Sequence, residues 1–307
     1  MLLVQPRAFG FNSETAGSNT LQHAPSAGAQ AVQAAALSEF NGLRQALQGE
    51  GVQVIVAEDS PNPVKPDAVF PNNWVSFHAD GTVVLYPMLA TSRRAERRRE
   101  IVDQVIREIG GTLRRLLDLT VHERDGRYLE GTGSLVLDHV GRIAYACRSP
   151  RTDSGLVEQW SAQMGYRAVV FDATDAAGVP YYHTNVMLGI GTDFAVLGAE
   201  SVAPADRERV RGELRDSGRR VVEIPREAIA GFAGNMLELA TWDEALGDAR
   251  VLVMSAAARA ALGDAQYRQL AGAVDSVLLV PVPTIERVGG GSVRCMIAEV
   301  FQTAPDA

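Results

Sequence analysis

Short aliphatic runs alternate with amphipathic helical patterns along most of the chain. Runs of about 4–8 such residues, bounded by Gly, Pro or Asp, are typical of buried strands. The predicted strands cover residues 52–58, 116–121, 167–173, 219–225 and 276–282. The predicted helices cover residues 31–49, 95–109, 156–164, 206–218 and 258–273. Strands that alternate with helices predict an α/β fold.

Five short motifs recur between these elements, and each begins with polar or small residues and continues with apolar ones. They are PNNWVSF at 71–77, EGTGSLVL at 130–137, HTNVMLGI at 183–190, GNMLEL at 234–239 and RCMIAEV at 294–300. Their spacing of roughly 50–60 residues lies at the upper end of the periods that mark structural repeats. A further strand-like run follows the first four motifs, as at 82–88 and 251–255. The predicted repeating unit is therefore ββαβ.

The two ends of the chain complement each other in this repeat. No helix follows the fifth motif, whereas the helix at 31–49 has no motif before it. We therefore predict five units that close into a ring, a five-bladed α/β propeller with a pseudo-fivefold axis, in a single domain over residues 1–307. An open doubly wound sheet is the alternative. In the ring, the polar heads of the motifs converge on one pocket: Asn73, Glu130, His183, Asn235 and Cys295.

Composition narrows the class of function. The net charge of −8 argues against a nucleic-acid partner, and most of the basic run at 93–99 is interpreted as a solvated helix face. No apolar stretch is long enough to span a membrane, and the first residues do not resemble a signal peptide. Two distant cysteines then favour a cytoplasmic location. No metal-binding or nucleotide-binding spacing is present, so we predict no metal and no cofactor. The sequence leaves open whether the protein forms a homo-oligomer.

A cysteine, a histidine and a carboxylate that meet in one pocket can perform nucleophilic catalysis. Cys295 follows GGGSVR, where glycines let the backbone approach a ligand and where Arg294 is expected to favour a thiolate. A buried structural thiol is the competing interpretation, and the residues alone leave both open. Cys147 is interpreted as a core thiol. We expect Trp74, Met187, Met236 and Met296 in the core, and His23, His78, His122 and His139 at the surface.

Several of these segments, taken in order, resemble one known superfamily. They are Pro66-Asp67-Ala68-Val69-Phe70, Asn72-Asn73, Leu129-Glu130-Gly131, Arg148-Ser149-Pro150-Arg151-Thr152, His183-Thr184-Asn185, Gly289 to Gly291 and Arg294-Cys295-Met296. Together they resemble the guanidine-modifying enzymes, or penteins, which include arginine deiminases, dimethylarginine hydrolases and amidinotransferases. The start FGFNSETAGSN and FPNNWVSFH look most like the citrulline-utilization hydrolases in that superfamily.

The resemblance implies a role for each matching position. Cys295 corresponds to the nucleophile, His183 to the general acid/base and Glu130 to an acid that contacts a substrate nitrogen. Asp67 falls where a relative holds the amino-acid end of its substrate. Arg93 and Arg151 fall where relatives clamp the α-carboxylate, a geometry that suits guanidinium groups.

Two positions depart from the arginine deiminase pattern. Asn73 and Asn185 stand where those enzymes carry aspartates that pair with a cationic guanidinium. An amide complements a neutral ureido group, whereas an unpaired buried carboxylate would be costly. The resemblance therefore implies a C–N hydrolase that converts citrulline to ornithine, ammonia and carbon dioxide. The alternatives are an arginine deiminase, an arginine dihydrolase, a dimethylarginine-type hydrolase, or a pentein that binds without catalysis.

Overall fold

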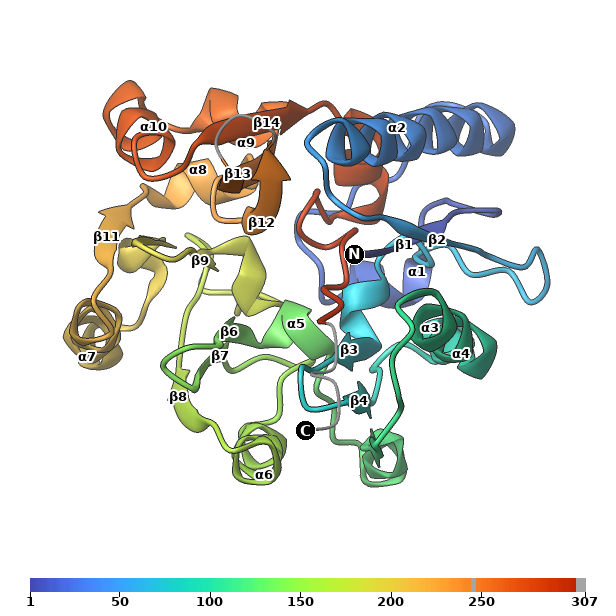
Figure 1. Cartoon of the computed structure of the whole chain (residues 1–307), viewed down its shortest axis with the longest axis horizontal. Helices are drawn as coiled ribbons and strands as arrows, with labels where there is room; N and C mark the ends of the chain where they lie inside the picture. Colours follow the sequence, from blue (N-terminus) through green and yellow to red (C-terminus); the bar gives the residue numbers. More distant parts are fainter. Residues whose placement is uncertain (244–246, 302–307) are drawn as a thin grey trace.

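Five small β-sheets carry the named strands in residues 1–243 and 247–301, the part of the chain that the computed structural model describes. Four sheets have three strands and one has two. In Figure 1 the sheets surround the centre of the view, and the helices α2, α4, α6, α7 and α10 lie outside them. The fold is thus mixed α/β, as predicted, whereas a closed ring with pseudo-fivefold symmetry stays a prediction.

The first two units follow the predicted order of elements. Unit one comprises η1 (Pro71–Asn73), β3 (Val75–Phe77), β4 (Thr82–Leu85), α3 (Thr91–Arg94), α4 (Arg99–Glu108) and β5 (Arg115–Asp118). After η2 (Thr120–Asp125), unit two comprises α5 (Gly131–Ser134), β6 (Val136–Asp138), β7 (Ile143–Cys147), α6 (Ser154–Met164) and β8 (Arg167–Phe171). In both, the first strand pairs antiparallel with the second, and the second pairs parallel with the third.

The third and fourth units repeat this pairing. Unit three comprises η3 (Thr184–Val186), β9 (Leu188–Ile190), β10 (Phe194–Leu197), η4 (Ala199–Ser201), α7 (Pro204–Asp216) and β11 (Arg220–Glu223). After α8 (Arg226–Ala230), unit four comprises β12 (Leu237–Asp243), β13 (Gly247–Ser255), α9 (Ala256–Ala261), α10 (Asp264–Ala271) and β14 (Ser276–Val280). The ββαβ order predicted from the motifs is present in all four units.

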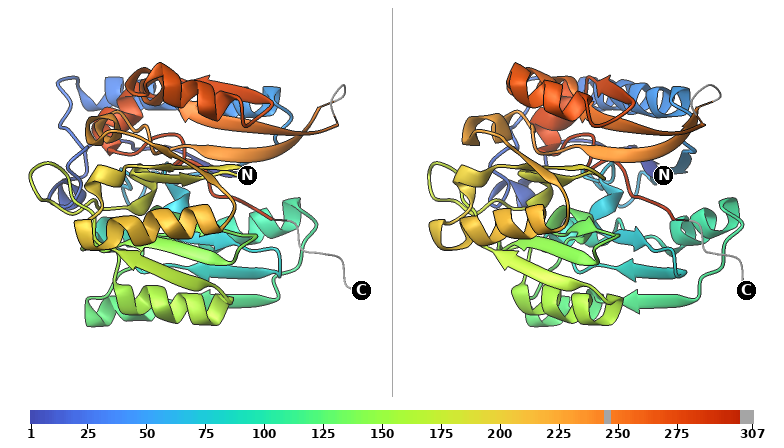
Figure 2. Two further views of the ribbon diagram at one scale, coloured as in Figure 1. Left: turned by 90° about the vertical axis from the view of Figure 1, so that its left-hand side faces the viewer. Right: turned by 60° about the vertical axis from the view of Figure 1, so that its left-hand side comes forward.

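The fifth unit joins the two ends of the chain. β1 (Leu2–Gln5) and β2 (Ile55–Glu58) pair in parallel, and α2 (Ala29–Gly49) connects them, with α1 (Ser13–Ala16) before it. The segment after the π-helix η5 (Ile285–Gly289) supplies the antiparallel neighbour, because Leu2 and Ala298 exchange backbone hydrogen bonds of 2.8 and 3.0 Å. Figure 2 shows this last segment running beside the N-terminus. The prediction that the end of the chain completes its start is confirmed.

Buried side chains at helical spacing attach the outer helices to the sheets. In α2 they are Val32, Ala36, Phe40, Leu43 and Leu47, a single apolar stripe. Trp74, Met187, Met236, Met296 and Cys147 are buried as predicted. Within the described residues, no helix has the length and apolarity needed to cross a membrane.

One predicted helix begins late and another is interrupted. The helix predicted at 95–109 begins only at Arg99, as α4, with Arg98 as its N-cap, and α3 ends before it at Arg94. The helix predicted at 258–273 divides into α9 and α10 at Gly263, the N-cap of α10. Arg93, in α3, and Glu96, between α3 and α4, lie in the interior, where they are 2% and 3% exposed. Arg93 is a predicted site residue, whereas the solvated face predicted for its neighbours is wrong at Glu96.

A buried glycine fixes the contact between units one and two. Gly131 has a φ of +47°, and a Cβ atom there would lie 2.1 Å from the carbonyl oxygen of Asn72. Gly126 has a similar φ of +66°, but a Cβ atom there would meet nothing within 4 Å. The two positions therefore separate backbone strain from steric overlap.

We expect Gly131→Ala to destabilise the protein far more than its matched control, Gly126→Ala. The control should cost about 1–2 kcal/mol for the left-handed backbone, and overpacking at Gly131 should add about 1–3 kcal/mol more. Free energies of unfolding from urea denaturation of both variants measure the difference. Equal costs would show that units one and two do not depend on this close contact.

Candidate active site

Six of the eight predicted site residues line one small cavity. They are Asp67, Asn73, Arg93, Arg151, His183 and Cys295, joined by Thr15, Asn19, Phe70, Tyr182 and the glycines at 289–291. Of the other two, Glu130 lies behind His183 and Asn185 lies against the sulfur of Cys295. All eight are buried, none more than 3% exposed. The fold thus brings together residues that are far apart in the sequence.

The loop before Cys295 is shaped by its glycines and by a buried glutamate. Gly290 ends η5 in the left-handed conformation, with a φ of +65°. At Gly291 a Cβ atom would lie 2.9 Å from the ring of Phe70, so glycine allows close packing against the cavity wall. Ser292 then donates a 2.7 Å hydrogen bond to Glu286, whose pKa is raised by burial. These contacts hold the loop that leads into Cys295 against the wall of the cavity.

His183 and Glu130 form a direct hydrogen bond of 2.8 Å between Nε2 and Oε2. Burial opposes the charge on Glu130, but Arg151, His183 and Arg93 outweigh it and lower its pKa to about 2. Burial lowers the pKa of His183 to about 4, against the opposing effect of Glu130. At neutral pH the pair is therefore a carboxylate and a neutral imidazole. An ionised carboxylate only accepts, so Nε2 carries the proton and Nδ1 is the basic nitrogen.

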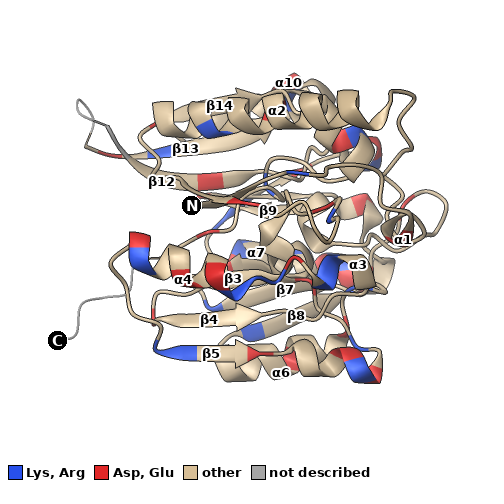
Figure 3. Cartoon of the chain, turned by 90° about the vertical axis from the view of Figure 1, so that its right-hand side faces the viewer, with Lys and Arg blue, Asp and Glu red and all other residues tan. Residues whose placement is uncertain are grey.

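The two buried guanidinium groups are held by different partners. Arg93 binds both oxygens of Glu96 at 2.9 Å and donates to Asn73 at 2.8 Å. Burial opposes its charge, yet Glu96 and Asp67 raise the pKa of Arg93 above its usual value. Figure 3 shows basic and acidic residues side by side around α3 and α4. Arg93 therefore orients Asn73 in addition to facing the cavity.

Arg151 is tied to the segment near the N-terminus. Its Nη2 donates to the Thr15 carbonyl at 3.1 Å and to Ser18 at 2.8 Å, and its Nη1 lies 3.4 Å from Glu130. Asn19 closes the same side, because its amide donates to the carbonyls of Gly289 and Gly290. The N-terminal segment thus covers the cavity and binds one arginine of the predicted carboxylate clamp.

Asp67 offers the cavity an acceptor. Its Oδ2 accepts a 2.8 Å hydrogen bond from Asn12, whereas its buried Oδ1 has no hydrogen-bond partner within the described part of the chain. Burial raises the pKa of Asp67, and Arg93 and the Asn12 hydrogen bond oppose that effect. A buried acceptor without a partner is costly, so an N–H group of a ligand would satisfy it.

The sulfur of Cys295 lies between two amides. Nδ2 of Asn235 is 3.2 Å from Sγ, and Nδ2 of Asn185 is 3.5 Å from it. The guanidinium group of Arg294, which we expect to favour a thiolate, binds Glu299 at 3.0 Å and the Ile297 carbonyl at 3.0 Å.

A sequence model of the family described as N,N dimethylarginine dimethylhydrolase, eukaryotic, matches residues 5–302. The chain belongs to this family. It is thereby a member of the pentein superfamily that the motifs resemble. Comparison with curated proteins gives no match.

Solved structures with the same fold come from related enzymes. The N-terminal domain of ArgZ, an arginine dihydrolase of the ornithine–ammonia cycle in cyanobacteria, matches with a TM-score of 0.74 and 16% identity, over 98% of each chain. A dimethylarginine dimethylaminohydrolase bound to S-methyl-L-thiocitrulline as an adduct matches with a TM-score of 0.64 and 17% identity, over 96% of each chain. Unliganded AgrE matches with a TM-score of 0.72 and 18% identity, over 99% of this chain and 39% of AgrE.

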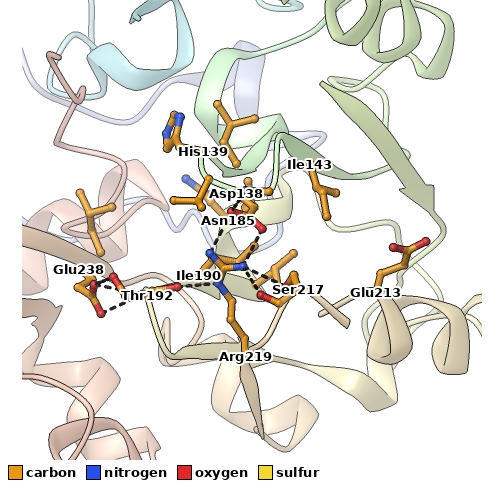
Figure 4. Close-up of a pocket in the computed structure, with 18 of the residues that line it drawn as sticks. Asp138, His139, Ile143, Asn185, Ile190, Thr192, Glu213, Ser217, Arg219 and Glu238 are labelled. Atoms are coloured by element: carbon orange, nitrogen blue, oxygen red, sulfur yellow. Dashed lines mark hydrogen bonds and ion pairs between the residues drawn. The ribbon is translucent and has the colours of Figure 1, made fainter. Parts of the chain in front are cut away.

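A larger cavity lies elsewhere in the protein. It measures about 550 Å³, against about 10 Å³ for the cavity at Cys295. In Figure 4 Arg219 reaches toward Asp138 and Ser217, while Glu238 binds Thr192. These charges already have partners, so size alone does not identify a catalytic site. Asn185 lines this cavity while touching Cys295, and it therefore lies between the two cavities.

Sequence reasoning missed several residues of the site. Thr15 and Ser18 lie in a segment without a repeat motif. They bind Arg151 through a backbone carbonyl and a hydroxyl, which no sequence pattern marks. Glu96 was assigned to solvent because its neighbours are charged. His78, predicted at the surface, is 7% exposed and bonds to Ser76 at 2.8 Å. Burial lowers the pKa of His78 to about 4.

The neutral state of His183 predicts a loss of stability in acid. Because its native pKa of about 4 lies below the ordinary value of 6.5, the unfolded chain binds a proton first as pH falls. The stabilising contribution is complete above pH 6.5 and is lost between there and about pH 4. His183→Asn should reduce the slope of unfolding free energy against pH in that window by up to about 1.4 kcal/mol per pH unit. Denaturation of both proteins at several pH values measures it, and an unchanged slope would contradict a neutral buried His183.

Proposed function

We propose that the protein is a cofactor-independent hydrolase that cleaves a C–N bond of a small amino acid of the arginine group, with citrulline as its substrate. The carrying observation is a small cavity lined by Cys295, by His183 with Glu130 hydrogen-bonded behind it, and by Asp67, which has one oxygen without a partner in the described residues. The proposal includes a single pentein domain over residues 1–307, a five-bladed arrangement of its sheets, and a cytoplasmic location.

The reaction follows from the states of these groups. His183 accepts the proton of the Cys295 thiol, and the resulting thiolate attacks the ureido carbon and forms a C–S bond. His183 donates that proton to the ornithine nitrogen as the C–N bond breaks, so ornithine departs and the sulfur keeps the carbamoyl group. His183 then takes a proton from water, whose oxygen attacks the same carbon. Cleavage of the C–S bond restores the thiolate, and the released carbamate yields ammonia and carbon dioxide.

The surrounding polar groups support binding of an amino acid. Arg151 and Arg93 would hold the α-carboxylate, with Arg151 exchanging its contacts to Ser18 and Thr15 for the ligand. Asp67 would accept from a ligand nitrogen. Asn73, held by Arg93 at 2.8 Å, would face the ureido group, and Asn185 would act beside the sulfur. Glu130 keeps His183 in its reactive tautomer.

A second candidate is hydrolysis of arginine or a methylated arginine. The partnerless carboxylate oxygen of Asp67 also suits a cationic guanidinium, because opposite charge compensates a buried carboxylate. This candidate agrees with the family description and with the fold shared with an arginine dihydrolase.

A substrate panel separates these candidates. We expect purified protein to convert citrulline to ornithine and ammonia, and to act more slowly on arginine and dimethylarginine. Ornithine, citrulline, dimethylamine and ammonia are quantified by mass spectrometry and an ammonia assay, with Cys295→Ser as the inactive control. Turnover of arginine without turnover of citrulline would reject the ureidase proposal. No turnover of any compound by the wild-type protein, with no labelling of Cys295 by a thiol-reactive substrate analogue, would favour a binding protein.

Asn73→Asp should reverse the preference within that panel. The new carboxylate adds negative charge beside Asp67 and Glu130 and removes the donor that a ureido oxygen would use. We expect kcat/KM for citrulline to fall by about 10-fold or more, roughly the loss of one hydrogen bond to a reacting group. The exposed Asn62→Asp serves as the matched control. Unchanged citrulline kinetics in Asn73→Asp would remove Asn73 from substrate selection.

A further inference from the structure

Asn235 has no role in the resemblance, yet it makes the shortest contact with the sulfur of Cys295 that the structure records. Its Nδ2 is 3.2 Å from Sγ, and its side chain is fully buried. It heads the fourth motif, GNMLEL, as His183 and Cys295 stand at the heads of the third and fifth. Among the motif heads, Asn235 is therefore placed to act on the reacting atom itself.

The backbone dictates which end of the Asn235 amide faces the sulfur. Nδ2 also donates to the Asn185 carbonyl at 3.1 Å, and Oδ1 accepts from the backbone N–H of Arg294 at 3.1 Å. An exchanged amide would set Oδ1 against the Asn185 carbonyl and two donors against each other at Arg294. Because both bonds would be lost, the N–H group must point toward Sγ.

Asn185 completes the contact from the other side and adapts to the state of the sulfur. Its Nδ2 lies 3.5 Å from Sγ and can donate to a thiolate. Its Oδ1 lies 3.8 Å from Sγ and can accept from a thiol. Asn235, by contrast, offers only a donor. A fixed donor favours the charged form of the group that it contacts.

The cationic groups around Cys295 are paired with acids, so the amides of Asn235 and Asn185 are the groups left to stabilise a thiolate there. His183, Asp67, Arg93 and Arg151 line the cavity with it, and Tyr182 stands beside them. Arg93 is paired with Glu96, Arg151 with Glu130 and the N-terminal segment, and His183 is neutral. Arg294, next in the chain, directs its guanidinium group to Glu299. Each cation near the sulfur thus has an anion of its own.

We infer that Asn235 is a further catalytic residue, which holds the Cys295 sulfur as a thiolate through a fixed N–H donor, with Asn185 as the adjustable second donor. The inference rests on the proposed function, since it assigns a role in the same reaction. The donor serves twice, because the sulfur carries negative charge before the attack and again when the C–S bond breaks.

The test measures the sulfur without using a substrate. Cys295 is alkylated with iodoacetamide at a series of pH values, and the modified peptide that contains it is quantified by mass spectrometry. The variants are Asn235→Asp, which puts an acceptor in place of the donor, and Asn235→Ala, which removes it. Thr184→Val is the matched structural control, because Thr184 is buried and bonds to Ser134 and to the backbone of Cys147 without touching Cys295 in any recorded hydrogen bond.

We expect the midpoint of the rate–pH curve to move upward by about one unit or more in Asn235→Asp and by a smaller amount in Asn235→Ala. Thr184→Val should lower the thermal midpoint of unfolding but leave the alkylation midpoint in place. An Asn235→Ala curve that coincides with wild type, or an equal shift in Thr184→Val, would overturn the inference. Asn235→Ala decides the question alone if Asn235→Asp does not fold.

The outcome is independent of the substrate panel. A shifted curve in a protein that turns over none of the compounds would retain the role of Asn235 at the sulfur and reject the proposed reaction. Turnover of citrulline with no shift would retain the reaction and reject the role of Asn235. The remaining activity of Asn235→Ala adds a second readout, because loss of a reacting-atom contact lowers kcat more than it raises KM.

Discussion

The buried carboxylate of Glu130 is the interaction on which the rest of the site depends. It is 1% exposed and lies within 4 Å of His183, Arg151 and Arg93. Removing one partner from a buried ionic group leaves an uncompensated charge, which typically costs about 3–5 kcal/mol. The same carboxylate sets the proton on Nε2 of His183 and attracts both guanidinium groups to the cavity. The charge balance of the cavity and the orientation of His183 therefore depend on the same carboxylate.

No single unit of the fold could assemble this network. Arg93 comes from unit one, Glu130 and Arg151 flank elements of unit two, His183 precedes η3 of unit three, and Cys295 lies near the end of the chain. The network also carries the contacts between units, because Gly131 allows α5 to touch η1 closely. Interactions between charged side chains of different units therefore affect both the packing of the units and the geometry of the candidate site.

Periodicity revealed most of the fold and the heads of the motifs. A strand and its polar head are encoded locally, so repetition exposed Glu130, His183 and Cys295 without any structure. Three features were not accessible in this way. Thr15 and Ser18 act through a carbonyl and a hydroxyl that any sequence offers, and Glu96 is buried between α3 and α4, where it binds Arg93. The direction of the Arg294 side chain depends on Glu299, a partner that neither motif nor charge pattern singles out. Burial of long polar side chains is decided by tertiary packing, which local pattern does not specify.

The hydrogen bonds between Leu2 and Ala298 have a consequence for the rate of folding. They join residues 296 positions apart in the sequence, so a very long loop has to close before β1 gains its antiparallel neighbour. The antiparallel pairs within units one to four join strands that are close in sequence and carry a much smaller cost of loop closure. Cys295 lies three positions before Ala298, so its arrival in the candidate site depends on the same long-range closure.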